Sequence, residues 1–304
     1  MSDLHNELEK LKEIMNNTLS TKNVVDNIEK EQDVTMPFST KDMALIFLDV
    51  EATGCDGEDD RMIQLAYLKQ QDNKVESYCD LCFTDGNMSY TAMGIHHITP
   101  ELLADATLAK ETESFKALEK ENTKLNYFIT HNNSLDVAML EKEGMILKMK
   151  RIDTDVCARH LLKDAENYKL QTLRYQYGLY RKEEATAKKF GVDSVRAHDA
   201  LGDALLHNLL FELLLEKVNG DINELVTLTN TAVLLEKITF GKYKDQNFTF
   251  EELFKTDPMD FVWMYTNLAT KWKDLENTVE HWLKKDQYYW KLAQEKRRKS
   301  AWFD

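Results

Sequence analysis

Two acidic residues interrupt one of the most apolar segments of the chain, and they restrict the folds that it can adopt. The segment "ALIFLDVEA" (residues 44–52) has the composition of a buried strand, yet it contains Asp49 and Glu51. Side chains at positions i and i+2 of a strand point to the same face, so both carboxyl groups project together. Burying two like charges costs several kcal/mol unless a shared proton, a basic partner or a divalent cation compensates them. The strand contains no Lys or Arg, and carboxylate oxygens suit Mg²⁺ or Mn²⁺.

A bound cation would require further acids, and two later segments provide them. "THNNSLDVAML" places Asp136 one turn into a helix that follows an expected strand, and "RAHDALGDALLHN" places Asp203 in a long apolar helix. His198 precedes Asp203 by five residues, which rotate an ideal helix by about 500° and leave about 140° between the two side chains. Both can therefore address one centre only if His198 lies at or before the helix start. A mobile imidazole at that position suits proton transfer.

The order of strand-like and helix-like segments indicates an α/β domain. "ALIFLDVEA", "MIQLAYLKQ" and "KVESYCDLCFT" are expected strands, and later strands alternate with helices, which predicts a mixed sheet flanked by helices. After Asn219 the chain becomes aromatic-rich and carries its own turn signals. We therefore expect three parts: an N-terminal helical extension (1–40), an α/β domain (41–220) and a small, mostly helical C-terminal domain with a basic tail (221–304). A helix packed on the outside of the domain is favoured over self-association for the N-terminal extension, because its heptad run is short.

Composition restricts the location and the partners. The sequence has no run of about 18 apolar residues, so we expect no membrane span. Its N-terminus lacks the apolar centre of a signal peptide, and four cysteines in 304 residues do not make a disulfide framework, which together predict a cytoplasmic protein. The net charge of -14 argues against broad nucleic-acid binding, since phosphate contacts need Lys and Arg. It does not exclude an enzyme that holds nucleic acid through metal ions.

Three ordered motifs carry a resemblance to a known family. They are "LDVEATG" with Asp49 and Glu51, "HNNSLD" with Asp136, and "HDALGD" with His198 and Asp203; "DRMIQLAY" and "MGIHHITPELL" between them also match in order and spacing. The chain from about residue 44 to 215 resembles the DEDDh 3′→5′ exonucleases of the DnaQ-like superfamily, which have a ribonuclease-H-like fold. The tail, with "ITFGKYKDQNFTFEELFKTDPMDFVWMYTN", is similar to the small C-terminal domain of exonuclease X-like proteins.

The resemblance implies a mechanism. Asp49, Glu51, Asp136 and Asp203 would hold two Mg²⁺ or Mn²⁺ ions about 3.5–4 Å apart. His198 would act as the general base for the attacking water. The expected reaction is hydrolysis from free 3′ ends of DNA, single strands preferred, with release of nucleoside 5′-monophosphates. RNA is the close alternative substrate. A catalytically silent nucleic-acid-binding module is the rival from another class, and it would be favoured only if an acid or His198 were missing.

Substrate contacts are expected at six further positions that the resemblance suggests. The backbone at Ala52, Thr53 and Gly54 resembles a cradle for the terminal nucleotide. Met93 and His97 resemble positions that pack against the terminal base or sugar, with simple loop packing as the alternative. Asn132 either orients the 3′ end or caps the next helix, and the cap is favoured because Asn is a good N-cap residue.

Other patterns are interpreted structurally. Cys79 and Cys82 lie in a strand pattern and have no second pair at zinc spacing, so we expect reduced, packed thiols. His96 and His97 are adjacent in extended chain and point apart, which disfavours a shared metal.

Two features of the tail could contact nucleic acid. The basic cluster at 296–299 beside Trp290 and Trp302 could bind phosphate, but a solvated terminus is favoured. Trp263, Tyr265 and Trp272 could form a stacking platform beside "FGKY", but the core of a small domain is favoured.

Overall fold

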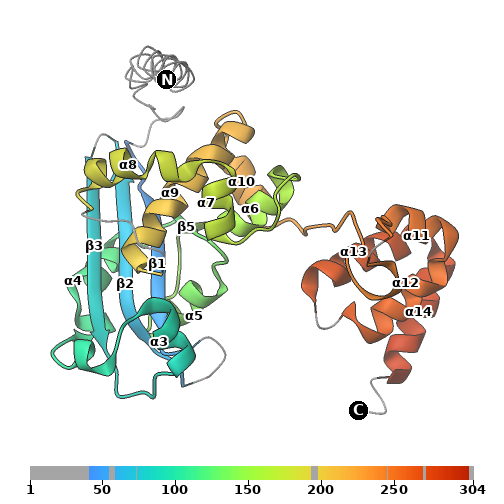
Figure 1. Ribbon diagram of the computed structural model, residues 1–304, viewed down its shortest axis with the longest axis horizontal. Helices are drawn as coiled ribbons and strands as arrows, with labels where there is room; N and C mark the ends of the chain where they lie inside the picture. The colour runs from blue at the N-terminus through green and yellow to red at the C-terminus, as the bar shows by residue number, and fades with distance from the viewer. Residues whose placement is uncertain are drawn as a thin grey trace, which may run out of the picture. The chain divides into compact units, whose positions relative to one another are not determined.

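The computed structural model describes residues 41–54, 59–72, 74–192, 198–244, 246–269 and 272–300 (Figure 1). The predicted N-terminal helical extension (1–40) lies outside the described residues. Within them, no helix is both long enough and apolar enough to cross a membrane.

A six-stranded mixed sheet forms the centre of the first domain. Its strands are β1 (Leu45–Ala52), β2 (Met62–Gln71), β3 (Lys74–Phe83), β4 (Thr107–Leu108), β5 (Tyr127–Thr130) and β6 (Lys150–Asp153). They lie in the order β4-β3-β2-β1-β5-β6. β1 pairs antiparallel with β2 and parallel with β5, while β5 pairs parallel with β6. The predicted ribonuclease-H-like mixed sheet flanked by helices is therefore confirmed.

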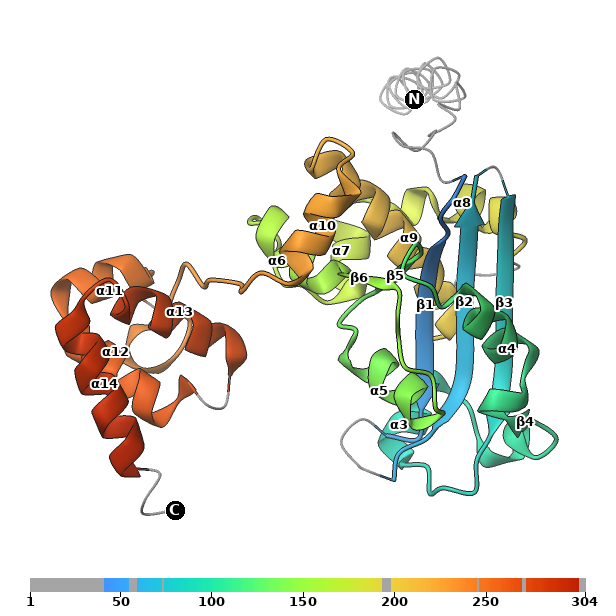
Figure 2. The ribbon, with the colours of Figure 1, turned by 180° about the vertical axis from the view of Figure 1, so that it is seen from behind.

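Helices cover both faces of this sheet. They are α3 (Tyr90–His96), α4 (Glu113–Glu121), α5 (Ser134–Lys142), α6 (Thr154–Leu161), α7 (Leu170–Gln176), α8 (Glu183–Phe190), α9 (Ala200–Lys217) and α10 (Ile222–Thr229). Short 3₁₀ helices occupy Pro100–Leu103, Ala109–Glu111, Leu179–Arg181 and Gly241–Tyr243. α9 lies in front of the sheet in Figure 1, and α4 and α5 lie on the opposite face, as Figure 2 shows from behind. The strands β1, β2 and β5 are thus mostly buried, whereas much of β3 is exposed.

The alternation of side chains along β1 assigns its residues to these two faces. Ile46, Leu48, Val50 and Ala52 belong to one buried cluster together with apolar residues of α4 and α5. The residues between them point the other way, toward α9, as the period of two in a strand requires. The two acids of β1 therefore face α9 rather than the apolar cluster.

Helix α10 changes the expected domain boundary. It packs against β6 and α6, and the Thr229 hydroxyl oxygen accepts the Asp153 amide N–H at 3.0 Å. The separate core of the C-terminal helices begins only at Leu235. We therefore propose that the boundary lies between residues 230 and 235, which is the later part of the interval from about 220 to 235 that the change in composition indicates.

The C-terminal domain consists of short helices around an aromatic core. Its elements are α11 (Phe250–Thr256), α12 (Pro258–Asn267), α13 (Lys273–Leu283) and α14 (Gln287–Ser300). The start of α11 is fixed by a capping box, in which Thr249 and Glu252 satisfy each other's backbone N–H groups. Phe250, Phe261 and Val279 are fully buried between the helices. The mostly helical composition expected for this part of the chain is observed.

Candidate active site

The register between β1 and α9 creates the acidic site. Phe47, Asp49 and Glu51 recur every two residues on one face of β1, and Asp203, His207 and Phe211 recur every four residues on one stripe of α9. The rings of Phe47 and Phe211 meet edge to face at 5.5 Å. Two residues further along β1 and one turn back along α9, Nε2 of His207 lies 3.9 Å from Asp49 Oδ1. The next step brings Asp203 to the two acids of the strand.

Three carboxyl groups converge at this end of β1. One carboxylate oxygen from each of Asp49, Glu51 and Asp203 lies within 4.8 Å of the others. Asp136, in the first turn of α5, is buried, and its Oδ1 accepts the Val50 amide N–H at 3.2 Å. That bond holds Asp136 against β1 between the two acids of the strand. The four acids predicted from three separate motifs are thus brought together in space.

The acids repel one another, and burial intensifies the repulsion. Burial, followed by the charges of Asp136, Asp203 and Glu51, raises the pKa of Asp49 well above its ordinary value. Burial is also the main cause that raises the pKa of Glu51 and of Asp136 to about 8, and that of Asp203 to about 6. Divalent cations bound by carboxylate oxygens would remove this penalty. The donor set therefore fits hard cations.

The raised pKa values predict how stability depends on pH and metal. Because folding raises the pKa of Glu51 from 4.5 to about 8, the folded state binds more protons than the unfolded state within that interval. In chelator, the contribution of this group to stability is fully present below its unfolded pKa and is lost as the pH rises toward about 8. Adding Mn²⁺ should therefore raise Tm more at about pH 8 than at about pH 5, by about 3 °C or more. Differential scanning calorimetry at both values measures this, and an equal metal effect at the two would contradict it.

His207 is a buried neighbour of the acids that sequence reasoning missed. Its Nδ1–H donates to the Leu48 carbonyl oxygen at 2.9 Å. Burial, together with the adjacent His131 ring, lowers the pKa of His207 to about 3. The imidazole is therefore neutral at ordinary pH, and it does not compensate the acids. Only its spacing of four residues from Asp203 could have identified it.

His198 lies two residues before α9, as the spacing predicted. Its backbone has φ 59°, a left-handed conformation in which His is tolerated better than most residues. Its amide N–H donates to Asp203 Oδ2 at 3.0 Å, and its side chain is exposed. The residue is therefore held against the acid cluster by its backbone, and its imidazole can move.

Polar side chains from two other elements position the start of α9 and Asp203. Gln64 on β2 pairs opposite Glu51, and its side-chain amide accepts the Ala200 N–H at 3.3 Å and donates to Asp199 at 3.4 Å. On α7, Gln171 donates to Asp203 Oδ1 at 3.1 Å.

An ion pair supports Gln171 in turn. Arg174 donates to Gln171 Oε1 at 3.0 Å and binds both carboxylate oxygens of Glu183, at 2.5 and 2.6 Å. These positioning residues were not identified from the sequence, because nothing in their spacing signals a contact with a distant helix.

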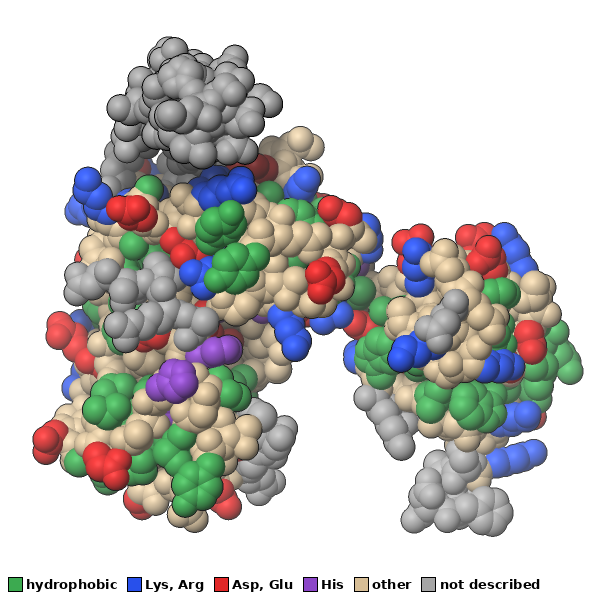
Figure 3. Space-filling model, in the orientation of Figure 1, with side chains coloured by type: hydrophobic (Ala, Val, Ile, Leu, Met, Phe, Trp, Pro, Cys, Tyr) green, Lys and Arg blue, Asp and Glu red, His purple; other side chains and the backbone are tan. Residues whose placement is uncertain are grey.

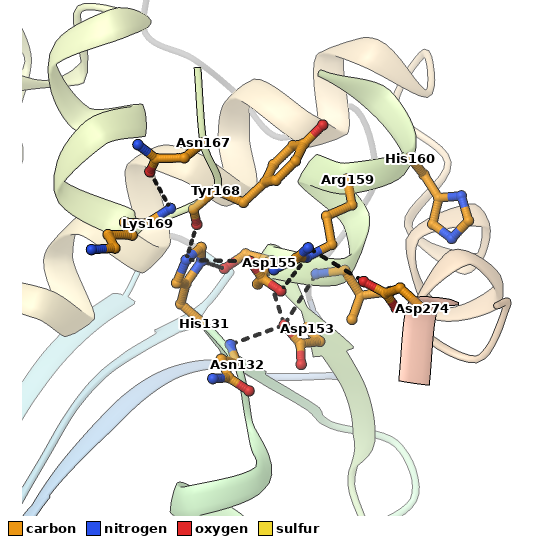
Figure 4. A network of polar contacts seen from close by, with 12 residues as sticks. His131, Asn132, Asp153, Asp155, Arg159, His160, Asn167, Tyr168, Lys169 and Asp274 are labelled. Atoms are coloured by element: carbon orange, nitrogen blue, oxygen red, sulfur yellow. Dashed lines mark hydrogen bonds and ion pairs between the residues drawn. The ribbon is translucent and has the colours of Figure 1, made fainter. Parts of the chain in front are cut away.

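The carboxylate of Asp153, at the end of β6, holds the turn that follows β5 (Figure 4). Asp153 accepts the amide N–H groups of Asn132 and Asn133 at 3.0 and 3.1 Å. His131 Nε2 donates to the Tyr168 carbonyl oxygen at 2.8 Å.

The structure corrects the role expected for Asn132. Asn133, not Asn132, is the N-cap of α5, so the favoured capping role of Asn132 is wrong. Asn132 has φ 63°, and its side-chain oxygen accepts the Ser134 hydroxyl at 3.3 Å.

A pocket of about 690 Å³ opens beside Glu51. Its lining residues are Glu51, Ala52, Gly54, Asp60, Ser89, Thr91, Ala92, Ile95, His96 and Leu135. A Cβ at Gly54 would meet Asp60 Oδ1 at 2.4 Å, so the Asp60 side chain would have to move if any other residue stood where the chain leaves β1. Two of the three predicted cradle residues, Ala52 and Gly54, thus line the pocket. Thr53 is buried, and its hydroxyl donates to Asp60 Oδ1 at 3.2 Å and accepts the Arg61 N–H at 3.0 Å.

The two residues predicted to contact the terminal base lie apart from this lining. Met93 is half-buried, and His97 is exposed at the end of α3 with φ 61°. Neither is among the lining residues that the structure describes, and their contacts with a substrate stay predictions. His96, which sequence reasoning treated only as a neighbour of His97, is buried and lines the pocket. Its Nδ1 accepts the Ile98 amide N–H at 3.0 Å.

Cys79 and Cys82 lie on β3 and are free thiols. Cys82 is buried in the apolar cluster with Leu65 and Tyr67, which agrees with the expected packing role. Cys79 is exposed, so the same expectation is wrong for this residue. Cys55 lies outside the described residues.

Comparisons with known proteins agree with the motifs. The model of the family described as Exonuclease matches residues 46–211, which is more than half of the chain. The DNA polymerase III PolC-type of Staphylococcus aureus is 26% identical over 175 residues, which make up 57% of this chain and 11% of that protein. The chain therefore spans only 11% of the length of this curated relative.

Two solved structures are also similar. Exonuclease X in complex with 5′ overhanging duplex DNA is 20% identical with a TM-score of 0.48, over 62% of this chain and 99% of that chain. E. coli Exonuclease I in complex with a dT13 oligonucleotide is 18% identical with a TM-score of 0.45, over 60% of this chain and 43% of that chain.

Proposed function

Because the chain belongs to the exonuclease family, we propose that it is a metal-dependent nuclease that hydrolyses DNA from the 3′ end, with single strands preferred. The convergence of carboxylate oxygens from Asp49, Glu51 and Asp203 within 4.8 Å of one another carries this proposal. Bringing together acids from a central strand and from a helix far away in sequence costs free energy, and bound cations would compensate it. The partial similarity to a DNA polymerase favours DNA over RNA.

The proposed cofactor is a pair of Mg²⁺ or Mn²⁺ ions. Asp49, Glu51, Asp136 and Asp203 would hold them, since burial and neighbouring acids raise the pKa values of these carboxyl groups and bound cations would offset both causes. When bound, such ions supply Lewis-acid stabilisation of the charge that develops on the phosphate oxygens.

His198 is proposed as the general base. Its backbone bond to Asp203 fixes its Cα beside the acids, while the exposed imidazole is free to approach a water molecule. An imidazole near neutral pH can take the proton of an attacking water and later release it to solvent. The products would be a shortened strand with a 3′-hydroxyl and a nucleoside 5′-monophosphate.

The pocket beside Glu51 is proposed to hold the 3′-terminal nucleotide. Its lining includes Ala52 and Gly54 at the end of β1, and Ile95 and His96 of α3. A backbone without a Cβ allows a sugar or a base to approach closely, which is a common use of glycine. Asn132, Thr53, Met93 and His97 stay candidate substrate contacts, and the cytoplasmic location stays a prediction from the sequence.

A time course on labelled oligonucleotides tests the proposed function. DNA and RNA strands of one sequence, labelled at the 5′ or the 3′ end, are incubated with Mg²⁺, Mn²⁺ or chelator. A ladder that shortens one nucleotide at a time from the 5′-labelled DNA, with immediate loss of the 3′ label as mononucleotide, is the expected result. Chelator should abolish it. Shortening of RNA but not of DNA would show that RNA is the substrate instead of DNA. Cleavage at internal positions would refute exonuclease action.

A further inference from the structure

Two tryptophans of the C-terminal domain lie outside its core. The buried cluster of this domain includes Phe250, Phe261 and Tyr265, whereas Trp263 and Trp272 are not part of it. Trp263 is 54% exposed on α12, and Trp272 is 39% exposed just before α13. The interpretation of these aromatics as core is therefore correct for Tyr265 and wrong for both tryptophans. An exposed indole does not gain the favourable free energy of burying its large apolar surface. We therefore looked for a binding role for these two side chains.

Trp263 borders a pocket of about 630 Å³, which we call the α12 pocket. It is lined by Phe240, Gly241, Lys242, Tyr243, Asp260, Trp263, Met264 and Leu268. Most of this lining is aromatic or aliphatic, and Phe240 is held by edge-on contact with Trp272 at 5.6 Å. Figure 3 shows hydrophobic and basic side chains mixed on the surface of this domain. The lining of the α12 pocket is therefore mostly apolar and includes the rings of Phe240, Tyr243 and Trp263.

The rim of the α12 pocket is polar on one side. Asp260 accepts hydrogen bonds from the Tyr243 hydroxyl and from Lys242 Nζ, the latter at 2.8 Å. These two partners lower the pKa of Asp260 against the opposing effect of its partial burial, so the carboxylate is ionised and balanced by Lys242. A balanced carboxylate can still accept N–H groups from a base edge, and the exposed lysine can reach a phosphate. A ligand made only of aliphatic groups would use neither the carboxylate nor the ammonium group.

Charge also distinguishes this domain from the rest of the chain. Residues 235–300 contain 13 Lys and Arg against 11 Asp and Glu, whereas the remainder of the chain contains 26 against 42. Lys242, which lines the α12 pocket, and Lys244, two residues later in the chain, are both exposed. Phosphate contacts need such cations, so a polyanionic strand is more compatible with this domain than with the acidic remainder.

We propose that the α12 pocket binds a base of single-stranded nucleic acid by stacking on Trp263. This would be a second contact with the strand, made by none of the residues of the acid cluster. Stacking on an aromatic side chain is tolerant of sequence, because every base has a π face. The domain would thus add affinity for any single strand without selecting its sequence.

Equilibrium binding in chelator tests this proposal, because no strand is hydrolysed there. Fluorescence anisotropy measures Kd of the full chain for a labelled single-stranded DNA of about 20 nucleotides and for an abasic strand of equal length. Trp263→Ala should raise Kd for the normal strand by about 5- to 100-fold. The same variant should bind the abasic strand as the wild type does. Trp263→Phe, which keeps a ring, should lie between, so that a folding defect cannot mimic the effect.

Tyr288→Ala provides the matched control. Tyr288 is an aromatic residue of α14 that is 69% exposed, and it does not line the α12 pocket. Its replacement should leave Kd unchanged. An unchanged Kd for Trp263→Ala, an equal loss in Tyr288→Ala, or equal wild-type affinity for normal and abasic strands would each overturn the proposal. In the first case a protein partner becomes the better occupant. A negative result in this binding assay would not change the hydrolysis measured in Mg²⁺. The binding proposal and the proposed nuclease activity can therefore fail independently of each other.

Discussion

Asp49→Asn is expected to reduce the rate of strand hydrolysis by about 10³-fold or more, since the metal contribution that depends on it is several kcal/mol. Asp49 is the acid on which the charges of Asp136, Asp203 and Glu51 all act, so it lies at the centre of the cluster. The amide keeps the size of the side chain and removes the charge. Single-turnover assays with saturating Mg²⁺ measure the loss, and high metal concentration should not restore the rate.

The same substitution should make the metal-free protein more stable. Removing one of several repelling carboxylates relieves the cost that raises their pKa values, so Tm in chelator should increase at about pH 8. Asp42→Asn, an exposed acid before β1, is the control for which neither rate nor Tm should change. A rate within tenfold of the wild type would show that Asp49 does not belong to the catalytic centre.

His198→Asn is expected to lower the rate by about 10²- to 10⁴-fold, which is the usual contribution of general acid–base catalysis. Asparagine tolerates the left-handed backbone at φ 59° and keeps the N–H that binds Asp203, so only the imidazole is lost. The pH–rate profile should lose the limb that reports deprotonation of the base. Mn²⁺ affinity should stay unchanged, because His198 is not proposed as a ligand.

The matched control for this experiment is His281→Ala. His281 is an exposed histidine on α13 in the other domain, and it should be replaceable without effect on the rate. If His198→Asn retained the full rate and the full pH profile, the proton would have to leave by another route. If it instead lost Mn²⁺ binding, His198 would be a ligand rather than a base.

Two geometric features of the candidate site could be predicted from the sequence because they depend on local periodicity. The alternation in β1 fixes that Asp49 and Glu51 share a face, and the five-residue step from His198 to Asp203 requires a position before the helix. Both statements involve residues only a few positions apart. The structure confirms the shared face and the position of His198 relative to α9.

Features that depend on packing between distant parts of the chain could not be predicted from the sequence. Gln64, Gln171 and Asp153 act on residues 20 or more positions away, and no spacing rule connects them. The change in composition after Asn219 suggested a domain boundary, but α10 still packs on β6. Such positions follow only from how the helices cover the sheet.

The helical C-terminal domain shows the same limit for aromatic residues. Its many aromatics indicate a small core, and most of them do form one. Composition does not say which face of α12 points inward, so the exposed Trp263 could not be separated from the buried Tyr265 two residues later. The tertiary packing of α12 against α13 and α14 makes that distinction.

Anomalous scattering from crystals of the full chain soaked in Mn²⁺ tests the central claim most directly. If the four acids hold divalent ions, manganese peaks are expected in contact with the carboxylates of Asp49, Glu51 and Asp203, with Asp136 among the ligands. The same soak of Asp49→Asn should show weaker peaks or none. Wild-type crystals that bind no manganese at these four acids, or that bind it only elsewhere, would contradict the claim that their convergence exists to hold divalent ions.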